Sequence, residues 1–435
     1  MAWELAFILN AFVLLILLVG GEWIAFSLGA AGLFALFIQG GTVNFHPLGS
    51  VIWNSVNNFT LTAIPLFIFM GEMVLHGGLS EKFYRGMGLI FSRVPGRLLQ
   101  ANIASCAIFA AVTGVSVATA ATVGTVAVPE LSKRGYDREM IFGSLAGGGT
   151  LGILIPPSVP FIIYGVMAQQ SITDLFAAGI IPGILLTLIF MIYVAIRVLV
   201  TPRLVPDESH EASLSAKEKA LALVHVLPVF GLIFLVLGGI YLGIMTPTEA
   251  AAVGAFVSIL LTACYGKLSV TALRLVLSQT VRTTSMILFI MVGASIFSFA
   301  LVNSGINREL TNWVVSLGQG QVTFFILICF IYVVLGCFFD PISMVVLTMP
   351  ILFPMVVQFG FDPIWYGVVV VVLIELGLIT PPVGFNLFVI HGISGGRPMG
   401  EIIRGSFPYM LMMLLMIVIL YFFPQIAIWL PRALK

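Results

Sequence analysis

The chain alternates between long apolar runs and short breaks that are polar or rich in glycine. A helix that crosses a bilayer needs about 20 predominantly apolar residues. Runs of this kind predict ten membrane-spanning segments, at residues 5–20, 23–40, 58–77, 140–168, 175–200, 221–243, 250–266, 285–303, 364–391 and 407–430. The pattern therefore predicts an all-α polytopic membrane protein.

Two further apolar stretches, 98–131 and 322–357, are too long for one ordinary span. Each has a weak centre: residues 112–116 read Val-Thr-Gly-Val-Ser, and residues 336–341 read Gly-Cys-Phe-Phe-Asp-Pro. A pair of half-length helices that meet at a small or polar tip fits each stretch. We therefore expect two re-entrant helical hairpins, each entering and leaving the membrane on one side.

Basic residues orient these hairpins, because cytoplasmic loops are rich in Lys and Arg. Arg93 and Arg97 precede the first hairpin, and Lys133, Arg134 and Arg138 follow it. The second hairpin has no basic residue at either edge. We therefore expect the first hairpin to open on the cytoplasmic face and the second on the opposite face, with both chain termini outside.

One apolar motif occurs twice, 225 residues apart: residues 151–157 read Leu-Gly-Ile-Leu-Ile-Pro-Pro, and residues 376–382 read Leu-Gly-Leu-Ile-Thr-Pro-Pro. Two prolines interrupt a helix, and paired interruptions in the two halves of a transporter mark its binding site. We therefore expect broken helices at 140–168 and 364–391. The halves are predicted to be inverted repeats, 1–200 and 221–435, joined by a cytoplasmic linker, 201–220. Each repeat would hold scaffold helices, an interfacial arm helix (79–97 or 305–318), a hairpin and a broken helix.

Composition narrows the functional classes. The chain is 60% hydrophobic and only 9% charged, against about 25% charged in soluble domains. We therefore expect the lipid bilayer as a partner, and no nucleic acid. The sequence has no Gly-x-x-x-x-Gly-Lys-Ser/Thr loop for ATP and no paired catalytic groups at membrane depth, which disfavours ATP-driven transport and an intramembrane enzyme. Its four cysteines lack metal-ligand spacing.

Each hairpin tip is expected to face a broken helix, so that polar residues form two clusters near the membrane midplane. Free backbone carbonyls and hydroxyl groups suit Na⁺, whereas half-helix N-termini suit an anion. The first cluster would contain Thr113, Gly114, Ser116 and Thr119, facing Thr150, Gly152, Pro156, Pro157 and Ser158. The second would contain Asp340 and Ser343, facing Glu375, Gly377, Thr380, Pro381, Pro382 and Asn386.

Within these clusters we assign two roles. The predicted Na⁺ ligands are Thr113, Gly114, Ser116, Thr119, Gly152, Asp340, Ser343, Gly377 and Thr380. The predicted substrate contacts are Pro156, Pro157, Ser158, Pro381, Pro382 and Asn386. Small hydroxyl residues also allow helices to pack closely in membranes, so any single Ser or Thr here is equally explained by packing.

Asp340 is the most specific of these residues. An ionisable group at membrane depth costs about 2.5–3.5 kcal/mol on insertion scales, so it usually marks an ion or substrate path. Asp340 stands directly before Pro341, inside the second hairpin. The alternative is an aspartate that caps the tip and reaches the outer water.

The motifs resemble a known family. The Gly-Ile-Leu-Ile-Pro-Pro-Ser sequence of 152–158, the Thr-Pro-Thr-Glu-Ala sequence of 246–250 and the paired hairpins together resemble the large membrane subunit of tripartite ATP-independent periplasmic (TRAP) transporters. The resemblance covers essentially the whole chain. It implies an elevator-type, Na⁺-coupled importer in a bacterial inner membrane. It also implies two partners, a small four-helix membrane subunit and a periplasmic substrate-binding protein.

The resemblance implies an organic anion as substrate: a C4-dicarboxylate, sialic acid or another sugar acid, or a 2-oxo acid. Asp340 corresponds to the family's sodium site in the outward hairpin, and Thr113, Gly114 and Ser116 correspond to the inward tip. This chain has Thr119 where many relatives have an aspartate after the first tip. The alternative function is a stand-alone divalent anion/sodium symporter of related architecture, which would transport without a soluble partner.

Overall fold

The computed structural model describes residues 3–206, 216–316, 318 and 320–434. All regular elements among these residues are helices, which confirms the predicted all-α class. The first half contains α1 (Trp3–Val19), α2 (Ile24–Gly40), α3 (Leu48–Val56), α4 (Ala63–His76), α5 (Leu79–Ile90), α6 (Leu98–Thr113), α7 (Ser116–Arg134), α8 (Arg138–Leu154), α9 (Val159–Ala168) and α10 (Ile172–Val200). The second contains α11 (Ala216–Tyr241), α12 (Pro247–Cys264), α13 (Val270–Asn303), α14 (Ile306–Ser316), α15 (Gln321–Gly336), α16 (Pro341–Gln358), α17 (Pro363–Leu378), α18 (Phe385–Ile393), α19 (Met399–Phe422) and α20 (Gln425–Ala433).

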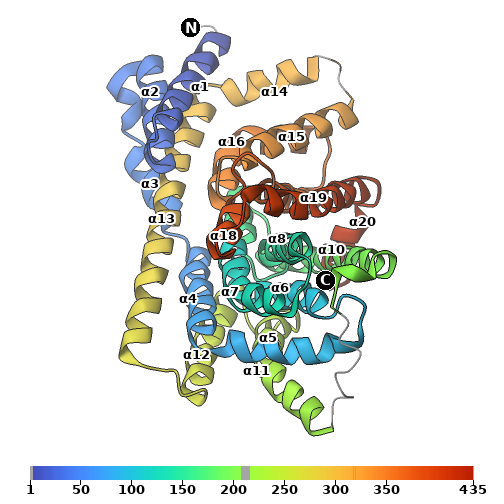
Figure 1. Ribbon diagram of the computed structural model, residues 1–435. Helices are drawn as coiled ribbons and strands as arrows, with labels where there is room; N and C mark the ends of the chain where they lie inside the picture. The colour runs from blue at the N-terminus through green and yellow to red at the C-terminus, as the bar shows by residue number, and fades with distance from the viewer. Residues whose placement is uncertain (1–2, 207–215, 317, 319, 435) are drawn as a thin grey trace.

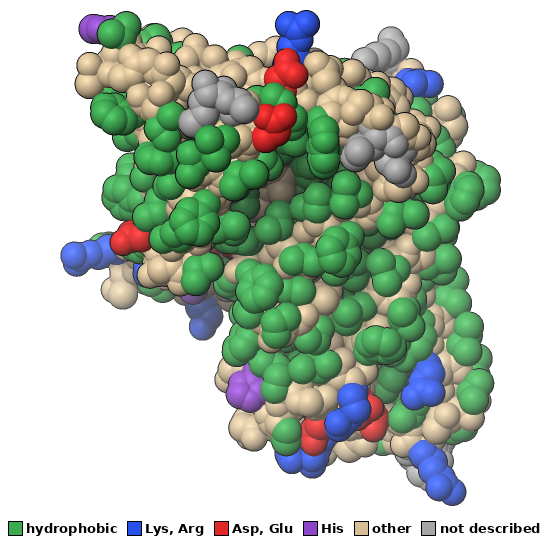
Figure 2. Space-filling model, turned by 90° about the horizontal axis from the view of Figure 1, so that it is seen from above, with side chains coloured by type: hydrophobic (Ala, Val, Ile, Leu, Met, Phe, Trp, Pro, Cys, Tyr) green, Lys and Arg blue, Asp and Glu red, His purple; other side chains and the backbone are tan. Residues whose placement is uncertain are grey.

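The outer surface is that of a membrane protein. In the part of the chain that the structure describes, nine helical segments are long and apolar enough to cross a bilayer, and α1 and α17 are shorter apolar helices. Large hydrophobic side chains are exposed along α10, α13, α15 and α19. On the face seen in Figure 2, hydrophobic side chains predominate and the few charged ones lie mostly near its margins. Exposed apolar surface on this scale requires a lipid environment.

The two halves share a sequence of elements. A short helix (α5 or α14) precedes a helix pair (α6–α7 or α15–α16), and a broken helix follows (α8–α9 or α17–α18). The α6–α7 pair turns at Gly114 and Val115, and the α15–α16 pair turns over 337–340. The breaks fall at 155–158 and 379–384, where the twin prolines stand. The division into inverted repeats on opposite membrane faces remains a prediction.

The elements form two groups (Figure 1). Helices α2, α4, α12 and α13, together called the side wall, pack on one another along one side of the molecule. The hairpins, broken helices, α10 and α19 form the other group, called the core body. Helices α5 and α14 lie at opposite ends of the molecule. Within the core body the halves cross over, because α7 contacts α18 and α16 contacts α9.

Glycines on α8 explain how the core body packs so closely. Every residue of α8 from Met140 to Leu154 is buried. A Cβ atom added at Gly149 would come within 2.6 Å of the Ala120 Cβ, and one at Gly152 within 2.7 Å of the Ser116 Cα. Small residues of this kind let helix backbones approach in membranes. The glycines thus bring the start of α7 directly against the end of α8.

Several predicted boundaries are wrong. Helix α13 begins at Val270, not 285, because Arg274 and Arg282 lower the hydropathy of its first turns without disfavouring the helix. The span predicted at 407–430 ends at Phe422, because Phe423 precedes Pro424 and leaves the helical region. Its last residues belong to the separate helix α20.

Two shorter segments also differ from the prediction. The nine-residue helix α3 was not predicted, because it is too short for a search based on 20-residue spans. Of the predicted linker 201–220, residues 207–215 lie outside the described part of the chain, and α11 already begins at Ala216.

Candidate functional site

The first hairpin tip is a buried cluster of hydroxyl groups. Gly114 ends α6 in the left-handed conformation with φ of 60°, which glycine adopts without steric cost. Beside it, the hydroxyl oxygens of Thr113 and Thr119 lie 2.7 Å apart. The Thr119 hydroxyl also lies 2.9 Å from the Val115 carbonyl oxygen, to which it can donate. The tip therefore presents buried oxygens held by short-range contacts.

This tip rests against the first break. A Cβ atom at Gly114 would stand 2.9 Å from the Pro157 carbonyl oxygen and 3.5 Å from the Ser158 Cα. The peptide bond between Pro156 and Pro157 is cis, as is the one between Pro381 and Pro382. The predicted contact between the first tip and the 155–158 break is therefore present, and only glycine fits at the contact.

A hydrogen bond joins the two halves at this point. The Asn386 side-chain amide of α18 donates to the Ser116 hydroxyl over 2.8 Å, across 270 residues of chain. The Ser116 hydroxyl in turn donates to the Gly149 carbonyl over 2.9 Å. The sequence placed Asn386 in the second cluster, whereas the structure brings it to the first tip. The crossing of α7 and α18 causes this difference.

Two buried polar atoms of residues at the first tip lack partners. The carbonyl oxygen of the Asn386 side chain and the hydroxyl of Ser158 are buried without a hydrogen bond. Both side chains are almost fully buried, at 0% and 1% exposure. Buried polar groups are nearly always satisfied, and an exception calls for a ligand, an ion or water. These two oxygens are therefore candidates for contact with a polar ligand.

The second tip is organised differently. Asp340 stands directly before α16, and one of its carboxylate oxygens accepts the backbone N–H groups of Ile342 at 3.1 Å and Ser343 at 3.2 Å. Its other oxygen accepts the Ser343 hydroxyl. Asp340 is thus an N-cap with Pro341 at the first helical position, an arrangement that stabilises helix starts. The predicted neighbours Asp340 and Ser343 are in direct contact.

Backbone approach links the second tip to the second break. A Cβ atom at Gly377 would come within 2.5 Å of the Gly336 Cα. The Cys337 thiol is positioned to donate to the Pro381 carbonyl over 3.2 Å. The Thr380 hydroxyl donates to the Leu376 carbonyl over 2.6 Å. The predicted residues Gly377, Thr380 and Pro381 therefore lie together with the α15–α16 turn.

Two other residues that the sequence singled out have distinct surroundings. The Thr150 hydroxyl donates to the Gly147 carbonyl of its own helix over 2.6 Å, which is a packing role. Glu375 is fully buried, and neither carboxylate oxygen has a hydrogen bond of ordinary geometry. The polar groups beside the Glu375 carboxylate are those of the backbone of Ile153 and Leu154, at the end of α8.

Sequence reasoning missed several contacts at both tips. Gly71 of α4 supports the first tip, since a Cβ atom there would stand 2.9 Å from the Thr113 Cα. Gly149 supplies the carbonyl that accepts the Ser116 hydroxyl. In the sequence, Gly336 and Cys337 stand out only as part of the weak centre of the second apolar stretch. Glycine within an apolar helix was the available signal for Gly71, Gly149 and Gly336.

The available ligands are oxygens. Hydroxyl, amide, carbonyl and carboxylate oxygens at the tips suit hard cations such as Na⁺, and the buried oxygens of Asn386 and Ser158 have no hydrogen-bond partner. Over the described ranges, no group of three or more His, Cys, Asp or Glu side chains could hold a metal ion. The donor set therefore fits an alkali cation or an organic ligand better than a transition metal.

Comparison with known proteins identifies relatives along the whole chain. A family model described as "Tripartite ATP-independent periplasmic transporter, DctM component" matches residues 11–426. The C4-dicarboxylate TRAP transporter large permease protein DctM of Pseudomonas aeruginosa is 35% identical over 411 residues, covering 93% of this chain and 94% of the relative. The sialic acid TRAP transporter large permease protein SiaM of Vibrio cholerae is 29% identical, covering 96% of each chain.

A solved structure has a similar fold. The YdaH transporter of Alcanivorax borkumensis superposes with a TM-score of 0.63 at 18% sequence identity, covering 90% of each chain. At this identity the likeness concerns the fold alone. It supports the fold of a polytopic membrane protein.

Proposed function

Because this chain belongs to the DctM-component family of tripartite ATP-independent periplasmic transporters, we propose that it is the large permease subunit of a Na⁺-coupled importer of an organic anion. The family consists of inner-membrane transporters, as the sequence predicted. We propose that a periplasmic binding protein delivers the anion and that a small four-helix membrane subunit completes the assembly.

The observation that supports this proposal best is the arrangement at the first tip, where Asn386 donates to Ser116 and Ser158 adjoins Gly114. Ser158 adjoins Gly114, and Asn386 bonds Ser116 two residues further along. The partnerless oxygens of Ser158 and Asn386 therefore flank one tip. We propose that a polar ligand bound at this tip supplies the partners that these atoms lack.

The two kinds of helix end at the tips and breaks suit ions of opposite charge. The helices α7, α9 and α18 begin at the tips and breaks without a side-chain cap, so their N-terminal N–H groups can hold a carboxylate. The start of α16 is already capped by Asp340. The helices α6 and α8 end at Thr113 and Leu154, and their terminal carbonyls suit Na⁺. We propose that the anion binds beside α9 and α18, with Na⁺ at the carbonyl ends and near Asp340.

We propose that the two groups of helices, the core body and the side wall, move relative to each other during transport. In an elevator-type cycle the core body would slide along the side wall, carrying both tips and breaks with it. Arm helices α5 and α14, which lie at opposite ends, would connect the two groups (Figure 1). The named relatives take a C4-dicarboxylate and sialic acid, so the substrate proposed here is a carboxylate without further specification.

Reconstitution tests the proposal. Proteoliposomes with the large and small subunits are given the cognate binding protein, loaded with a radiolabelled C4-dicarboxylate or sialic acid, and an inward Na⁺ gradient. Uptake of one of these probes should require both the gradient and the binding protein. Asn386→Leu, which removes the polar atoms at similar volume, should lower uptake at least about tenfold, the scale of one lost buried polar contact.

The contrary outcomes are distinct. Uptake without any binding protein would indicate the stand-alone symporter of related architecture. Uptake that is independent of Na⁺ would contradict the coupling ion. Normal uptake by the folded Asn386→Leu variant would remove the first tip as the binding site.

A further inference from the structure

One carboxyl group is enclosed in the core body, and the transport cycle proposed above does not use it. Among the side chains whose exposure the structure describes, Glu375 is the only Asp, Glu, Lys or Arg that is buried, with 0% exposure. Neither of its carboxylate oxygens has a hydrogen bond of ordinary geometry, and it forms no ion pair with a described residue. Glu375 belongs to the last turn of α17, and the backbone of Ile153 and Leu154 lies beside it.

This position connects the two broken helices. Two residues after Glu375, Gly377 packs on the second hairpin, where a Cβ atom added to it would stand 2.5 Å from the Gly336 Cα. Helix α17 also packs on α8, whose last residue, Leu154, directly precedes the first break. The charge of Glu375 therefore acts on both breaks and on the second tip.

The surroundings of this carboxyl favour positive charge. Helix α8 ends at Leu154 and α17 ends at Leu378, and the C-terminal end of a helix carries partial negative charge. An ionised Glu375 would add a full negative charge beside these two ends, without a basic partner. Taking such a charge out of water is strongly unfavourable. The carboxyl group therefore requires a bound cation or a proton.

The charged side chains of the neighbouring helices do not neutralise Glu375. The helices that pack on α17 are α8, α9, α10, α15, α16, α18, α19 and α20. Their charged and titratable side chains, tyrosine and cysteine apart, are all at least partly exposed, as are Asp340 before α16 and Asp362 before α17. The titratable ones are Glu139, Asp174, His391 and Glu401, and the others are Arg138, Arg197, Arg404 and Arg432. None of them forms an ion pair or a hydrogen bond with Glu375.

A proton suits this carboxyl better than a metal cation does. Hard metal cations take several oxygen ligands at once. No hydroxyl, amide or second carboxyl group of the described residues bonds to Glu375, and these residues contain no cluster of His, Cys, Asp and Glu that could hold a metal ion. A proton needs one carboxyl oxygen, and it removes the buried charge. Carboxyl groups at membrane depth are typical of proton relays.

We propose that Glu375 is a proton-binding site and that it carries one proton inward together with the substrate. The carboxylate takes the proton from water on the outer side and returns it to water on the inner side, so that only the carboxyl O–H bond forms and breaks. The proton travels with the core body, to which both breaks belong. This inference rests on the proposed function, because a bound proton crosses the membrane only if the core body moves.

Infrared difference spectroscopy of the purified full-length protein detects this proton without any transport. The C=O stretching band of a protonated carboxylic acid should be present at neutral pH and should shift in deuterated water. Glu375→Gln, which keeps the size of the neutral acid, should remove this band. A thermal melt verifies that the variant is folded.

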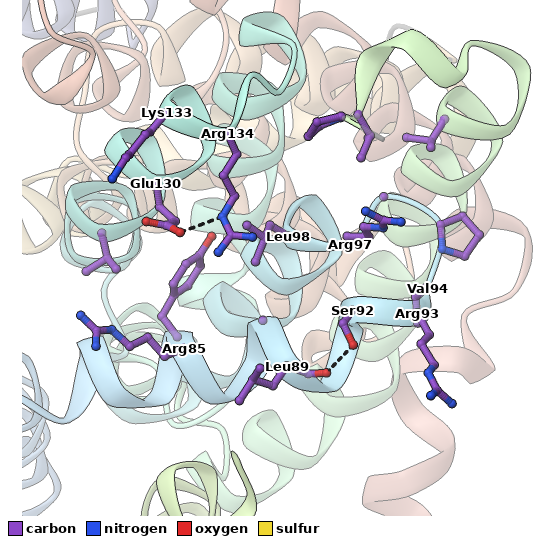
Figure 3. Close-up of a pocket in the computed structure, with 18 of the residues that line it drawn as sticks. Arg85, Leu89, Ser92, Arg93, Val94, Arg97, Leu98, Glu130, Lys133 and Arg134 are labelled. Carbon is purple, nitrogen blue, oxygen red and sulfur yellow. Dashed lines mark hydrogen bonds and ion pairs between the residues drawn. The ribbon is translucent and has the colours of Figure 1, made fainter. Parts of the chain in front are cut away.

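Glu130→Gln is the matched control. Glu130 also belongs to the core body, but it is 45% exposed and is paired with Arg134 at 2.8 Å, at the edge of an open cleft (Figure 3). A solvated, ion-paired carboxylate gives no such band. The control variant should therefore retain the band in full.

Proteoliposomes with the large and small subunits and the binding protein test whether the proton is carried. The probe is the radiolabelled C4-dicarboxylate or sialic acid that the reconstituted protein takes up. With the Na⁺ gradient held constant and the membrane potential clamped, a pH gradient of about one unit, acidic outside, should raise accumulation about tenfold for one proton per cycle. Glu130→Gln should show the same increase, and Glu375→Gln should show none.

The contrary outcomes separate the steps. Absence of a band that depends on Glu375 would overturn the proton site, and loss of the band on addition of NaCl would assign the carboxylate to Na⁺. Accumulation that does not respond to the pH gradient in the unchanged protein would overturn the carried proton. If the unchanged protein takes up neither probe under any gradient, the proposed function fails, whereas the infrared band still decides whether Glu375 holds a proton.

Discussion

At the scale of single residues, the tips depend on a few groups that cannot be exchanged freely. Gly377 and Gly336 touch backbone to backbone, and Gly114 allows the first tip to meet Pro157. Asp340 carries a charge into the second hairpin, and at the same time it caps α16. A test of its charge must therefore preserve its capping role.

Asp340→Asn meets that condition, because asparagine is an equally good N-cap. We expect the variant to fold and assemble normally, and Na⁺-driven uptake to fall at least about tenfold, since a carboxylate near the proposed ion site is lost. The measurement is initial uptake as a function of Na⁺ concentration in proteoliposomes.

Asp362→Asn is the control. Asp362 caps α17 in the same way, accepting the backbone N–H groups of Ile364 and Trp365 at 2.8 and 3.1 Å. This variant should retain the sodium dependence of the unchanged protein. If Asp340→Asn shows the same sodium dependence as well, Asp340 is only a helix cap.

At the scale of elements, each half contains a helix pair and a broken helix, and the pairs reach across to the opposite half. The tip of α6–α7 rests on the break between α8 and α9, while α7 also contacts α18. The breaks fall where Pro-Pro interrupts the apolar run, because proline removes a backbone donor and clashes with the preceding turn. A helix pair is re-entrant if both of its ends are accessible from the same face of the membrane.

Cysteine labelling distinguishes the faces. Pro95→Cys and Ser132→Cys lie at the two exposed ends of the first pair, and Gln321→Cys and Gln358→Cys at those of the second. In intact cells and inverted vesicles, the first two should react with an impermeant maleimide only from the cytoplasmic side, and the other two only from outside. A hairpin whose two ends label from opposite sides is a simple crossing.

At the scale of the whole molecule, the side wall meets the core body at the first tip. Gly71 of α4 has no side chain to separate the wall from Thr113, and a Cβ atom there would stand 2.9 Å from the Thr113 Cα. If the core body slides along the wall, this contact must break and re-form in each cycle. A larger side chain at Gly71 would obstruct that movement.

Gly71→Val should therefore lower uptake at least about tenfold, because overpacking between rigid backbones costs about 1–3 kcal/mol. Gly231→Val is the control, since no atom lies within 4 Å of a Cβ atom added at Gly231 on α11. Transport by the control should be close to that of the unchanged protein. Equal uptake by both folded variants would show that the tip does not pass Gly71 during transport.

Local sequence patterns were sufficient to predict much of the structure of this protein. Apolar run length indicated the spanning helices, Gly and Pro indicated the tips and breaks, and their combined motifs identified the family. These signals act within about 20 residues, which is the range over which a helix begins, spans or breaks. The predicted helix boundaries were wrong where a segment contains charged residues and is nevertheless helical, as in the first turns of α13.

Only the tertiary structure decided which polar groups meet. Asn386 is hydrogen-bonded to Ser116, which lies 270 residues away in the sequence, and α16 of the second half contacts α9 of the first. Both result from how helix faces pack, and packing depends on small residues such as Gly149 and Gly152 on several helices at once. A single sequence states which residues can approach closely, whereas the assembled fold determines which of them do.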